Sequence, residues 1–239
     1  MKRNSLKKMK ADEIRQMHLL SSKTPFLITE AYKTLRTNLL YSIFSRGLKT
    51  VIVTSSNKGE GKSTTCANLA LTLAMTKSKV LLIDADMRSP TQYMFFKQNN
   101  NHGLSSVLAG FDKFDEAVKK EVAPGLDLLT AGTVPPNPME LLSSPRMKDL
   151  LERLKQQYDY VIIDTPPVNV VSDGIVLMTS ATGVVLVSRQ GVTTYDALRR
   201  AHERVEITEG VFLGAIVTFV DPKNKSYGRY ARQREYQYE

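Results

Sequence analysis

The chain has 239 residues, 42% of them hydrophobic and 24% charged, which is the size and composition of one globular α/β domain with polar ends. The single cysteine, Cys66, excludes an internal disulfide, and no run of about eighteen apolar residues is present to span a bilayer, so we expect a cytoplasmic protein whose contact with a membrane is peripheral. The net charge of +9 would suit anionic partners, but no recognition-helix or aromatic-stacking motif accompanies it, and we expect no specific nucleic-acid ligand.

The chain begins with a basic segment that precedes a predicted helix. Residues 1–10 carry five basic side chains and no acid, a pattern usual for a solvated tail, with attraction to anionic lipid as the functional alternative. A helix is predicted over 30–44, because Leu35 and Leu39 continue an i, i+4 apolar stripe, and Thr29 is its expected N-cap. A charged stripe on the same helix is either a solvated face or a subunit contact and comprises Glu30, Lys33 and Arg36.

A strand, a glycine-rich loop and a second helix follow within about twenty-five residues. The β-branched run 50–54 predicts the strand, and the small residues of 63–75 predict a helix that lies close against a sheet. The two loop glycines allow backbone N–H groups to point inward, where the helix N-terminus and the charge of Lys62 favour a polyphosphate. Ser63 offers a hydroxyl to Mg²⁺, and the flanking strand and helix argue against an ordinary surface turn. The predicted phosphate loop comprises Ser56, Asn57, Lys58, Gly59, Glu60, Gly61, Lys62, Ser63 and Thr64.

The next strand, predicted over 80–83, ends in a pair of acids. An apolar run closed by an acid is typical of a buried parallel strand whose carboxyl end opens onto a site. Asp84 and Asp86 alternate along the extended chain and therefore point to the same side, where their mutual repulsion favours a bound cation. Helix N-capping or turn formation by the two aspartates is the alternative.

Short elements and a second acidic strand end are predicted for the middle of the chain. They are two short helices within 103–120, a strand over 126–130, a stiff proline-rich connector over 134–138 and an amphipathic helix over 145–158. The apolar strand that begins at residue 160 ends in Asp164, which is placed to meet a metal ion or a metal-bound water.

Two more strands, 184–188 and 212–219, flank a predicted helix over 193–207. Strands that alternate with helices imply parallel βαβ units, and hence a three-layer, doubly wound, mostly parallel sheet of the P-loop NTPase type. The expected organisation is a basic N-terminal segment 1–29, one domain 30–220 and a flexible tail 221–239.

The polar tail contains four tyrosines that it cannot bury. They are either idle residues of a solvated tail or phosphate acceptors. The second interpretation requires the last strand to run parallel to the first, which directs the tail to the edge that carries the phosphate loop. The four are Tyr227, Tyr230, Tyr236 and Tyr238.

Together, the phosphate loop and the two acidic strand ends resemble the Walker A, Walker A′ and Walker B motifs of bacterial protein-tyrosine kinases. The tail tyrosines, the PPNPMELL stretch at 135–142 and the charged stripe of the first helix are similar to that family too, so the resemblance runs from about residue 30 to the C-terminus. The tail tyrosines are fewer and more widely spaced than in a typical cluster. Three positions also depart from the family pattern: Lys33 replaces Arg, Lys58 replaces Pro, and Thr218 replaces an Asn that meets adenine.

The resemblance implies a cytoplasmic kinase of the capsular or exopolysaccharide co-polymerase system that uses ATP and Mg²⁺. Its implied partners are a membrane-anchored activator that holds it at the inner face of the cell membrane, neighbouring subunits in a ring, a cognate tyrosine phosphatase and protein substrates. The implied acceptors are its own tail tyrosines. By the same resemblance, Lys62 holds the phosphates and Ser63 binds Mg²⁺. Metal coordination and tyrosine activation are shared by Asp84, Asp86 and Asp164, with Asp84 as the base. The contact with the neighbouring subunit is made by Glu30, Lys33 and Arg36.

Two other functions share these nucleotide motifs. A dimeric ATPase switch that positions DNA or division proteins would use water as acceptor, and its relatives carry a loop lysine at the position of Asn57, although Lys58 stands beside it. A nucleotide-responsive scaffold would need no chemistry, against which the intact Lys62, Ser63 and three acids argue. The tail and the proline stretch favour the kinase.

Overall fold

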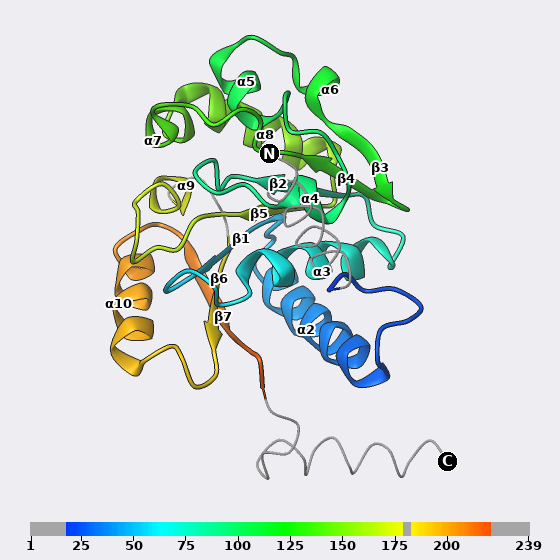
Figure 1. The fold of residues 1–239 in the computed structure, drawn as a ribbon, viewed down its shortest axis with the longest axis vertical. Helices are drawn as coiled ribbons and strands as arrows, with labels where there is room; N and C mark the ends of the chain where they lie inside the picture. The colour runs from blue at the N-terminus through cyan, green and yellow to red at the C-terminus, as the bar shows by residue number, and fades with distance from the viewer. Residues whose placement is uncertain (1–17, 179–182, 221–239) are drawn as a thin grey trace, which may run out of the picture.

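The computed structural model describes residues 18–178 and 183–220 and is organised by one seven-stranded sheet (Figure 1). The strands are β1 (Thr50–Ser55), β2 (Val80–Asp84), β3 (Lys119–Ala123), β4 (Leu126–Leu129), β5 (Tyr160–Asp164), β6 (Gly183–Arg189) and β7 (Val211–Thr218). Their order is β3-β4-β2-β5-β1-β6-β7, and every pair is parallel except β3 with β4. The predicted mostly parallel sheet is therefore confirmed.

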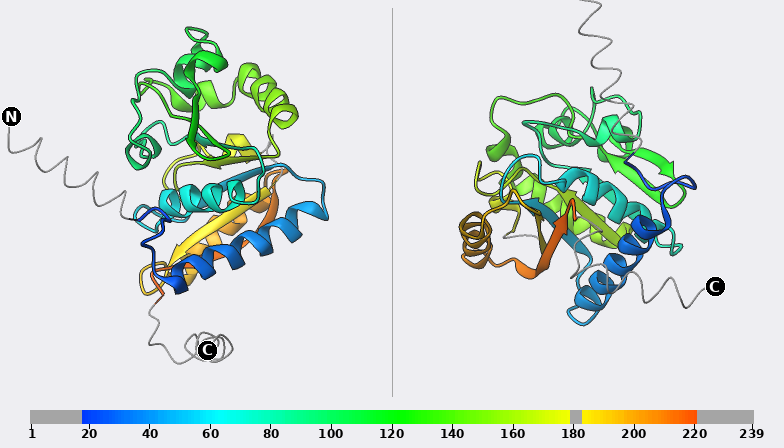
Figure 2. Two further views of the ribbon diagram at one scale, coloured as in Figure 1. Left: turned by 90° about the vertical axis from the view of Figure 1, so that its right-hand side faces the viewer. Right: turned by 60° about the horizontal axis from the view of Figure 1, so that its bottom comes forward.

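Helices cover both faces of this sheet. They are α2 (Phe26–Phe44), α3 (Lys62–Ala74), α4 (Gln92–Phe95), α5 (Leu104–Ala109), α6 (Phe114–Ala117), α7 (Pro138–Leu142), α8 (Pro145–Gln157), α9 (Ile175–Met178) and α10 (Tyr195–Glu206). The views in Figures 1 and 2 show α2 and α3 as neighbours, and these two helices share one hydrophobic core with the sheet. Residues of α5 to α10 share the second core.

The alternation of side chains along the strands creates the two cores. On β1, Val51 and Val53 enter the core beneath α2 and α3, whereas Ile52 enters the opposite core. All six residues of β1 are buried, as a central parallel strand covered on both faces requires. The same reasoning applies to β2, which is also fully buried.

The two amphipathic helices begin with side-chain caps. Ser144 accepts a hydrogen bond from the backbone N–H of Met147 at the start of α8, where Pro145 takes the first helical position. Thr194 accepts from the N–H of Ala197 at the start of α10. The predicted helix over 145–158 is confirmed to within one residue. The buried side of α8 consists of Met147, Leu150, Leu151 and Leu154.

The start of the first helix was predicted wrongly. The helix begins at Phe26, one turn before residue 30, with Pro25 at the N-cap position. Thr29 is not the N-cap, because it lies inside the first turn, where its hydroxyl donates to the carbonyl of Pro25 (Oγ1···O 3.4 Å). The apolar run that starts at Phe26 extends the helix, although the charged stripe begins only at residue 30.

Four short elements were not predicted. The residues 119–120 belong to β3 and not to a helix, and the predicted connector ends at residue 137, because Pro138 takes the first position of α7. Helices α4 and α9 each have four residues, too few for a periodic pattern to reveal them. None of the helices within 18–178 and 183–220 has the length and apolarity that crossing a bilayer demands.

Candidate active site

Sheet order brings the three predicted motifs together. β5 lies between β2 and β1, and Asp84 at the end of β2 is in register with Asp164 at the end of β5. The phosphate loop leaves the carboxyl end of β1 at the same edge. Because parallel strands end at a common edge, motifs that lie up to about a hundred residues apart in the chain meet in one site.

The glycines give the loop its shape. Gly59 and Gly61 have φ angles of 79° and 85°, a left-handed conformation that other residues adopt only with strain. Gly61 is also the N-cap of α3, so the helix starts directly where the loop ends. A loop of this kind presents backbone N–H groups to an anion at a helix N-terminus, as the sequence predicted.

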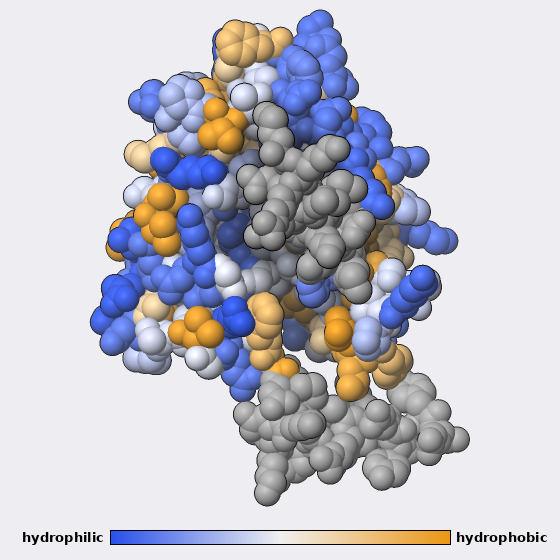
Figure 3. All heavy atoms as spheres, viewed as in Figure 1, coloured by the Kyte–Doolittle hydropathy of each residue, from blue (hydrophilic) through white to orange (hydrophobic). Residues whose placement is uncertain are grey.

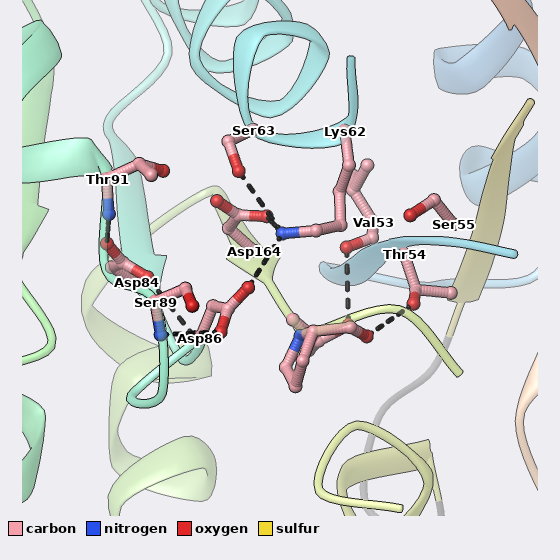
Figure 4. A network of polar contacts seen from close by, with 12 residues as sticks. Val53, Thr54, Ser55, Lys62, Ser63, Asp84, Asp86, Ser89, Thr91 and Asp164 are labelled. Carbon is pink, nitrogen blue, oxygen red and sulfur yellow. Dashed lines mark hydrogen bonds and ion pairs between the residues drawn. The ribbon is translucent and has the colours of Figure 1, made fainter. Parts of the chain in front are cut away.

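Lys62 lies against the carboxylates at the strand ends (Figure 4). Its Nζ is 2.6 Å from Asp164 Oδ1 and 3.4 Å from Asp86 Oδ2, and it donates to Ser63 Oγ at 3.2 Å. Burial alone would lower the pKa of this lysine, but the attraction of Asp164 and Asp86 outweighs it and raises the pKa above its usual value. Lys62 therefore carries a positive charge that compensates the buried acids.

Asp84 is fully buried and held by backbone N–H groups. Its Oδ2 accepts from Thr91 N and Gln92 N, both at 2.9 Å, and its Oδ1 accepts from Asp86 N at 3.2 Å. Burial and the repulsion of Asp164 raise the pKa of Asp84 to about 7, although the backbone donors and Lys62 act in the opposite direction. A carboxyl group with this pKa can exchange a proton near neutral pH.

Asp86 lies nearer to the surface of the site. Its Oδ1 accepts from Ser89 N at 3.1 Å, while Oδ2 faces Lys62. Burial raises its pKa, and the charge of Lys62 opposes that rise. Asp86 and Asp164 thus lie against one lysine, with Asp84 beside them, and form a charge cluster. The turn and capping alternative also holds in part, because Asp86 accepts from the turn N–H of Ser89 and Asp84 accepts from the N–H groups at the start of α4.

The oxygen donors of the site fit a magnesium ion shared with phosphates. No three acidic, imidazole or thiol side chains converge on one point within the described ranges, so an all-protein metal cage is not present there. Ser63 Oγ, Asp86 and Asp164 nevertheless lie around the Lys62 ammonium, and Gln92 Oε1 is buried without a hydrogen-bond partner among the described residues. Mg²⁺ suits such a set because it usually takes one or two carboxylates and completes its shell with water and phosphate.

A hydrogen-bond network that was not predicted fixes the loop from the side of β6 and β7. The buried carboxylate of Glu60 accepts from Asn57 N at 3.0 Å and from Thr193 Oγ1 at 2.6 Å. Thr218 Oγ1 donates to the Glu60 carbonyl at 2.7 Å, and Arg189 Nη1 donates to the Gly59 carbonyl at 3.3 Å. Thr218 therefore supports the loop backbone from the position where the family pattern has Asn.

Replacing Thr193 with Val should loosen the phosphate loop. Thr193 Oγ1 donates to Glu60 and also accepts from Arg189 N at 2.7 Å, and Val keeps the shape but removes both bonds. We expect a loss of stability of about 1–3 kcal/mol, because the buried Glu60 carboxylate loses its shortest hydrogen bond and keeps only the longer ones from Asn57. We also expect a rise in the Kd for ADP, measured by isothermal titration calorimetry. Thr193→Ser should retain both properties; equal affinities for Val and Ser variants would contradict the role of this hydroxyl.

A second ion pair links the loops that follow β2 and β5. Arg88 Nε lies 2.6 Å from Asp173 Oδ2, and Arg88 Nη2 donates to Asp173 Oδ1 at 3.1 Å. Asp173 is buried, whereas the arginine side chain is half exposed. The hydrogen bond to Asp173 raises the pKa of Arg88 further. This bidentate pair joins the two loops beyond the paired strand ends, and the sequence offered no signal for it, because 85 residues separate the partners.

A cavity of about 570 Å³ adjoins the phosphate loop. Gly61 and Thr64 form one wall, Thr218 and Phe219 a second, and Tyr32 of α2 a third. The segment before α2 closes the remaining side, where the side chain of Asn68 accepts from Leu20 N and donates to the His18 carbonyl, both at 2.8 Å. This volume lies within the range of small-molecule sites.

The remaining predicted residues divide into two groups. The four tail tyrosines lie outside the described residues, but β7 does run parallel to its neighbour β6 and ends at Thr218, against the phosphate loop. On α2, Lys33 pairs with Glu30 at 2.7 Å, and Arg36 Nη1 donates to the Thr72 carbonyl of α3 at 2.9 Å. Their contact with a neighbouring subunit stays a prediction.

Comparisons with known proteins identify the family. An AAA domain model matches residues 49–206. Tyrosine-protein kinase YwqD of Bacillus subtilis is 40% identical over 95% of this chain and 96% of its own, and tyrosine-protein kinase CpsD of Streptococcus agalactiae is 36% identical over 84% and 87%. The kinase domain of the Escherichia coli tyrosine kinase ETK superposes with a TM-score of 0.79 at 34% identity, covering 86% of this chain and 84% of that domain. These findings confirm the resemblance read from the motifs and favour the kinase over the ATPase switch: the chain belongs to the family of bacterial tyrosine-protein kinases.

Proposed function

We propose that this tyrosine kinase uses ATP and Mg²⁺ to phosphorylate the tyrosines of its own tail, and that the acceptor tail belongs to a neighbouring molecule. The observation that carries the proposal is the convergence of Lys62 with Asp84, Asp86 and Asp164 at adjacent strand ends, beside the point where β7 delivers the chain to its tail. This arrangement offers a cation for phosphates and acids for metal and acceptor.

The phosphate loop and the adjoining cavity would bind different parts of the nucleotide. The backbone of Gly59 to Thr64 would hold the phosphates, and the nucleoside would occupy the cavity between Tyr32 and Phe219. When bound, ATP supplies the phosphoryl group that is transferred, and Mg²⁺ offsets the negative charge of the phosphates. Lys62 would leave Asp164 for the phosphates, and Ser63, Asp86 and Asp164 would then be free to hold the metal.

Asp84 is the proposed base. A free tyrosine has a pKa of about 10, so complete deprotonation at neutral pH would cost about 4 kcal/mol. A carboxylate whose pKa is raised to about 7 accepts such a proton more readily than an ordinary aspartate does. The three backbone N–H groups that surround Asp84 fix its orientation while it does so.

Transfer between molecules can be tested by mixing two incomplete chains. One chain carries Lys62→Met and an intact tail, and the other keeps its site but ends at residue 220. A tail of about eighteen residues spans at most about 60 Å, which would allow both self and neighbour phosphorylation, so reach alone cannot decide. In this mixture we expect phosphate on the tail of the Lys62→Met chain. In a separate dilution series of wild type alone, the phosphorylation rate per molecule should fall as the protein is diluted. A rate that stays constant on dilution would refute transfer between molecules.

The wider setting follows from the family resemblance and is likewise proposed. A membrane-anchored activator would hold the kinase at the inner face of the membrane, neighbours would form a ring through Glu30, Lys33 and Arg36, and a phosphatase would reset the tail during capsular or exopolysaccharide synthesis. The first turn of α2 supports a partner at this end of the molecule, because Phe26 is 64% exposed and Ile28 is 46% exposed. Figure 3 shows hydrophobic side chains over this end of α2, with other hydrophobic groups spread over the same face.

A further inference from the structure

Gln92, the first residue of α4, touches three parts of the site at once. Its backbone N–H donates to Asp84 Oδ2 at 2.9 Å, and its side-chain Nε2 donates to Asp164 Oδ2 at 2.7 Å and to the Ser63 carbonyl at 3.1 Å. The residue is fully buried. Both groups that face Nε2 are acceptors only, so the orientation of the amide is determined by its surroundings.

That orientation leaves the amide oxygen without a partner. Gln92 Oε1 is buried and accepts no hydrogen bond from any residue within 18–178 and 183–220. A buried amide oxygen in this state costs free energy, and such groups are usually satisfied by a water or a ligand. The oxygen belongs to a side chain that contacts Asp164 and the backbone of Ser63, which are two of the proposed metal-binding residues.

Asp164 depends on Gln92 once Lys62 moves. Among the described residues, the carboxylate of Asp164 accepts one hydrogen bond from Lys62 and one from Gln92, on opposite oxygens. If Lys62 turns to the phosphates of a nucleotide, the Gln92 bond is the one that remains. The Gln92 bond would continue to hold Asp164 Oδ2. Asp164 Oδ1 would then face the position that Lys62 has left.

We propose that Gln92 is a positioning residue of the magnesium site, which orients Asp164 through Nε2 and accepts a hydrogen bond from a metal-bound water through Oε1. This proposal rests on the proposed use of Mg²⁺ and nucleotide by the phosphate loop. Hydrogen-bonding partners behind metal ligands commonly change metal affinity or activity by 10–100-fold when they are removed.

The test measures nucleotide binding, not turnover. The affinity of the full-length protein for a fluorescent ADP analogue is titrated in EDTA and at increasing Mg²⁺, for wild type, Gln92→Met, Gln92→Asn and the control Gln98→Met. Gln98 carries the same side chain six residues later, but its amide donates to the backbone carbonyl of Phe96 (3.2 Å) and not to a residue of the site described above. The backbone bond from residue 92 to Asp84 is available in every variant, so the comparison isolates the side chain.

For Gln92→Met, we expect an affinity in EDTA within about twofold of wild type and a Mg²⁺ concentration for half-maximal effect that rises about tenfold. Gln92→Asn keeps the amide but shortens the side chain by one CH₂ group, so it should lose the bond to Asp164 and show the same rise. This second variant tests the proposal if the Gln92→Met protein fails to fold. Wild-type Mg²⁺ dependence in Gln92→Met, or an equal loss with and without Mg²⁺, would overturn the proposal. Absence of Mg²⁺-dependent binding in wild type would instead refute the proposed use of the metal.

Discussion

Replacing Lys62 with Met should reduce tail phosphorylation by at least about a thousandfold and should also destabilise the nucleotide-free protein. The first effect follows from removal of the charge that would hold the phosphates. The second follows from the ion pairs: Lys62 is 7% exposed and lies against Asp164 and Asp86, so its loss leaves two buried carboxylates uncompensated. Breaking a buried pair in this way costs about 3–5 kcal/mol. Urea unfolding and ³²P labelling measure the two effects separately.

A second variant separates the loss of charge from loss of fold. In Lys62→Met with Asp164→Asn, one of the two uncompensated carboxylates is neutralised, so part of the stability should return while phosphorylation stays absent. Labelling retained in Lys62→Met would contradict the assignment of the phosphate loop. An unchanged free energy of unfolding would contradict the buried charge cluster.

The variant Asp84→Asn should lose activity and gain stability at alkaline pH. Because the folded-state pKa of Asp84 is raised to about 7, the folded protein binds this proton more tightly than the unfolded chain does. The contribution of Asp84 to stability is therefore fully present below its unfolded pKa of about 4 and is lost as the pH rises to about 7. A neutral amide avoids that loss, offset in part because its NH₂ group meets one of the backbone donors. We expect a net gain on the order of 1–3 kcal/mol at pH 8.

The pH dependence distinguishes this cause from a change in packing. Urea unfolding of wild type and Asp84→Asn at pH 8 and at pH 4.5 should show the gain only at the higher pH, because the wild-type carboxyl is protonated in the folded state at the lower one. Phosphorylation by the variant should be lost at pH 8, where the wild-type carboxylate is available as the base. A variant that is less stable than wild type at both pH values would show that the hydrogen bonds of Asp84 outweigh its buried charge.

Much of the fold was predictable because its central strands are buried on both faces. Continuous apolar runs such as 80–83 and 160–163 have no other common explanation when an acid closes them, and the structure confirms both as neighbouring parallel strands. The phosphate loop was equally clear, since a strand must precede it and a helix must follow. Asp84, Asp86, Lys62 and Asp164 are therefore brought together as the motifs implied.

Other features depend on contacts that a local pattern does not contain. β3 reads as polar sequence, yet Lys120 in it is held by Asp127 at 3.0 Å and by Tyr158 at 3.1 Å, so tertiary pairing overrides its weak strand propensity. The support of the loop through Glu60 and Thr193 joins residues 133 positions apart. Gln92 belongs to a four-residue helix whose importance appears only when Asp84, Ser63 and Asp164 are seen around it.

The most direct test of the kinase assignment is intact-mass and peptide mass spectrometry of the purified full-length protein after incubation with Mg·ATP, with and without cytoplasmic segments of candidate membrane activators. The account predicts phosphate on Tyr227, Tyr230, Tyr236 or Tyr238 that is absent in Lys62→Met. Steady release of ADP with unmodified tyrosines, in the presence of a segment shown to bind, would contradict it and favour an ATPase switch that uses water as its acceptor.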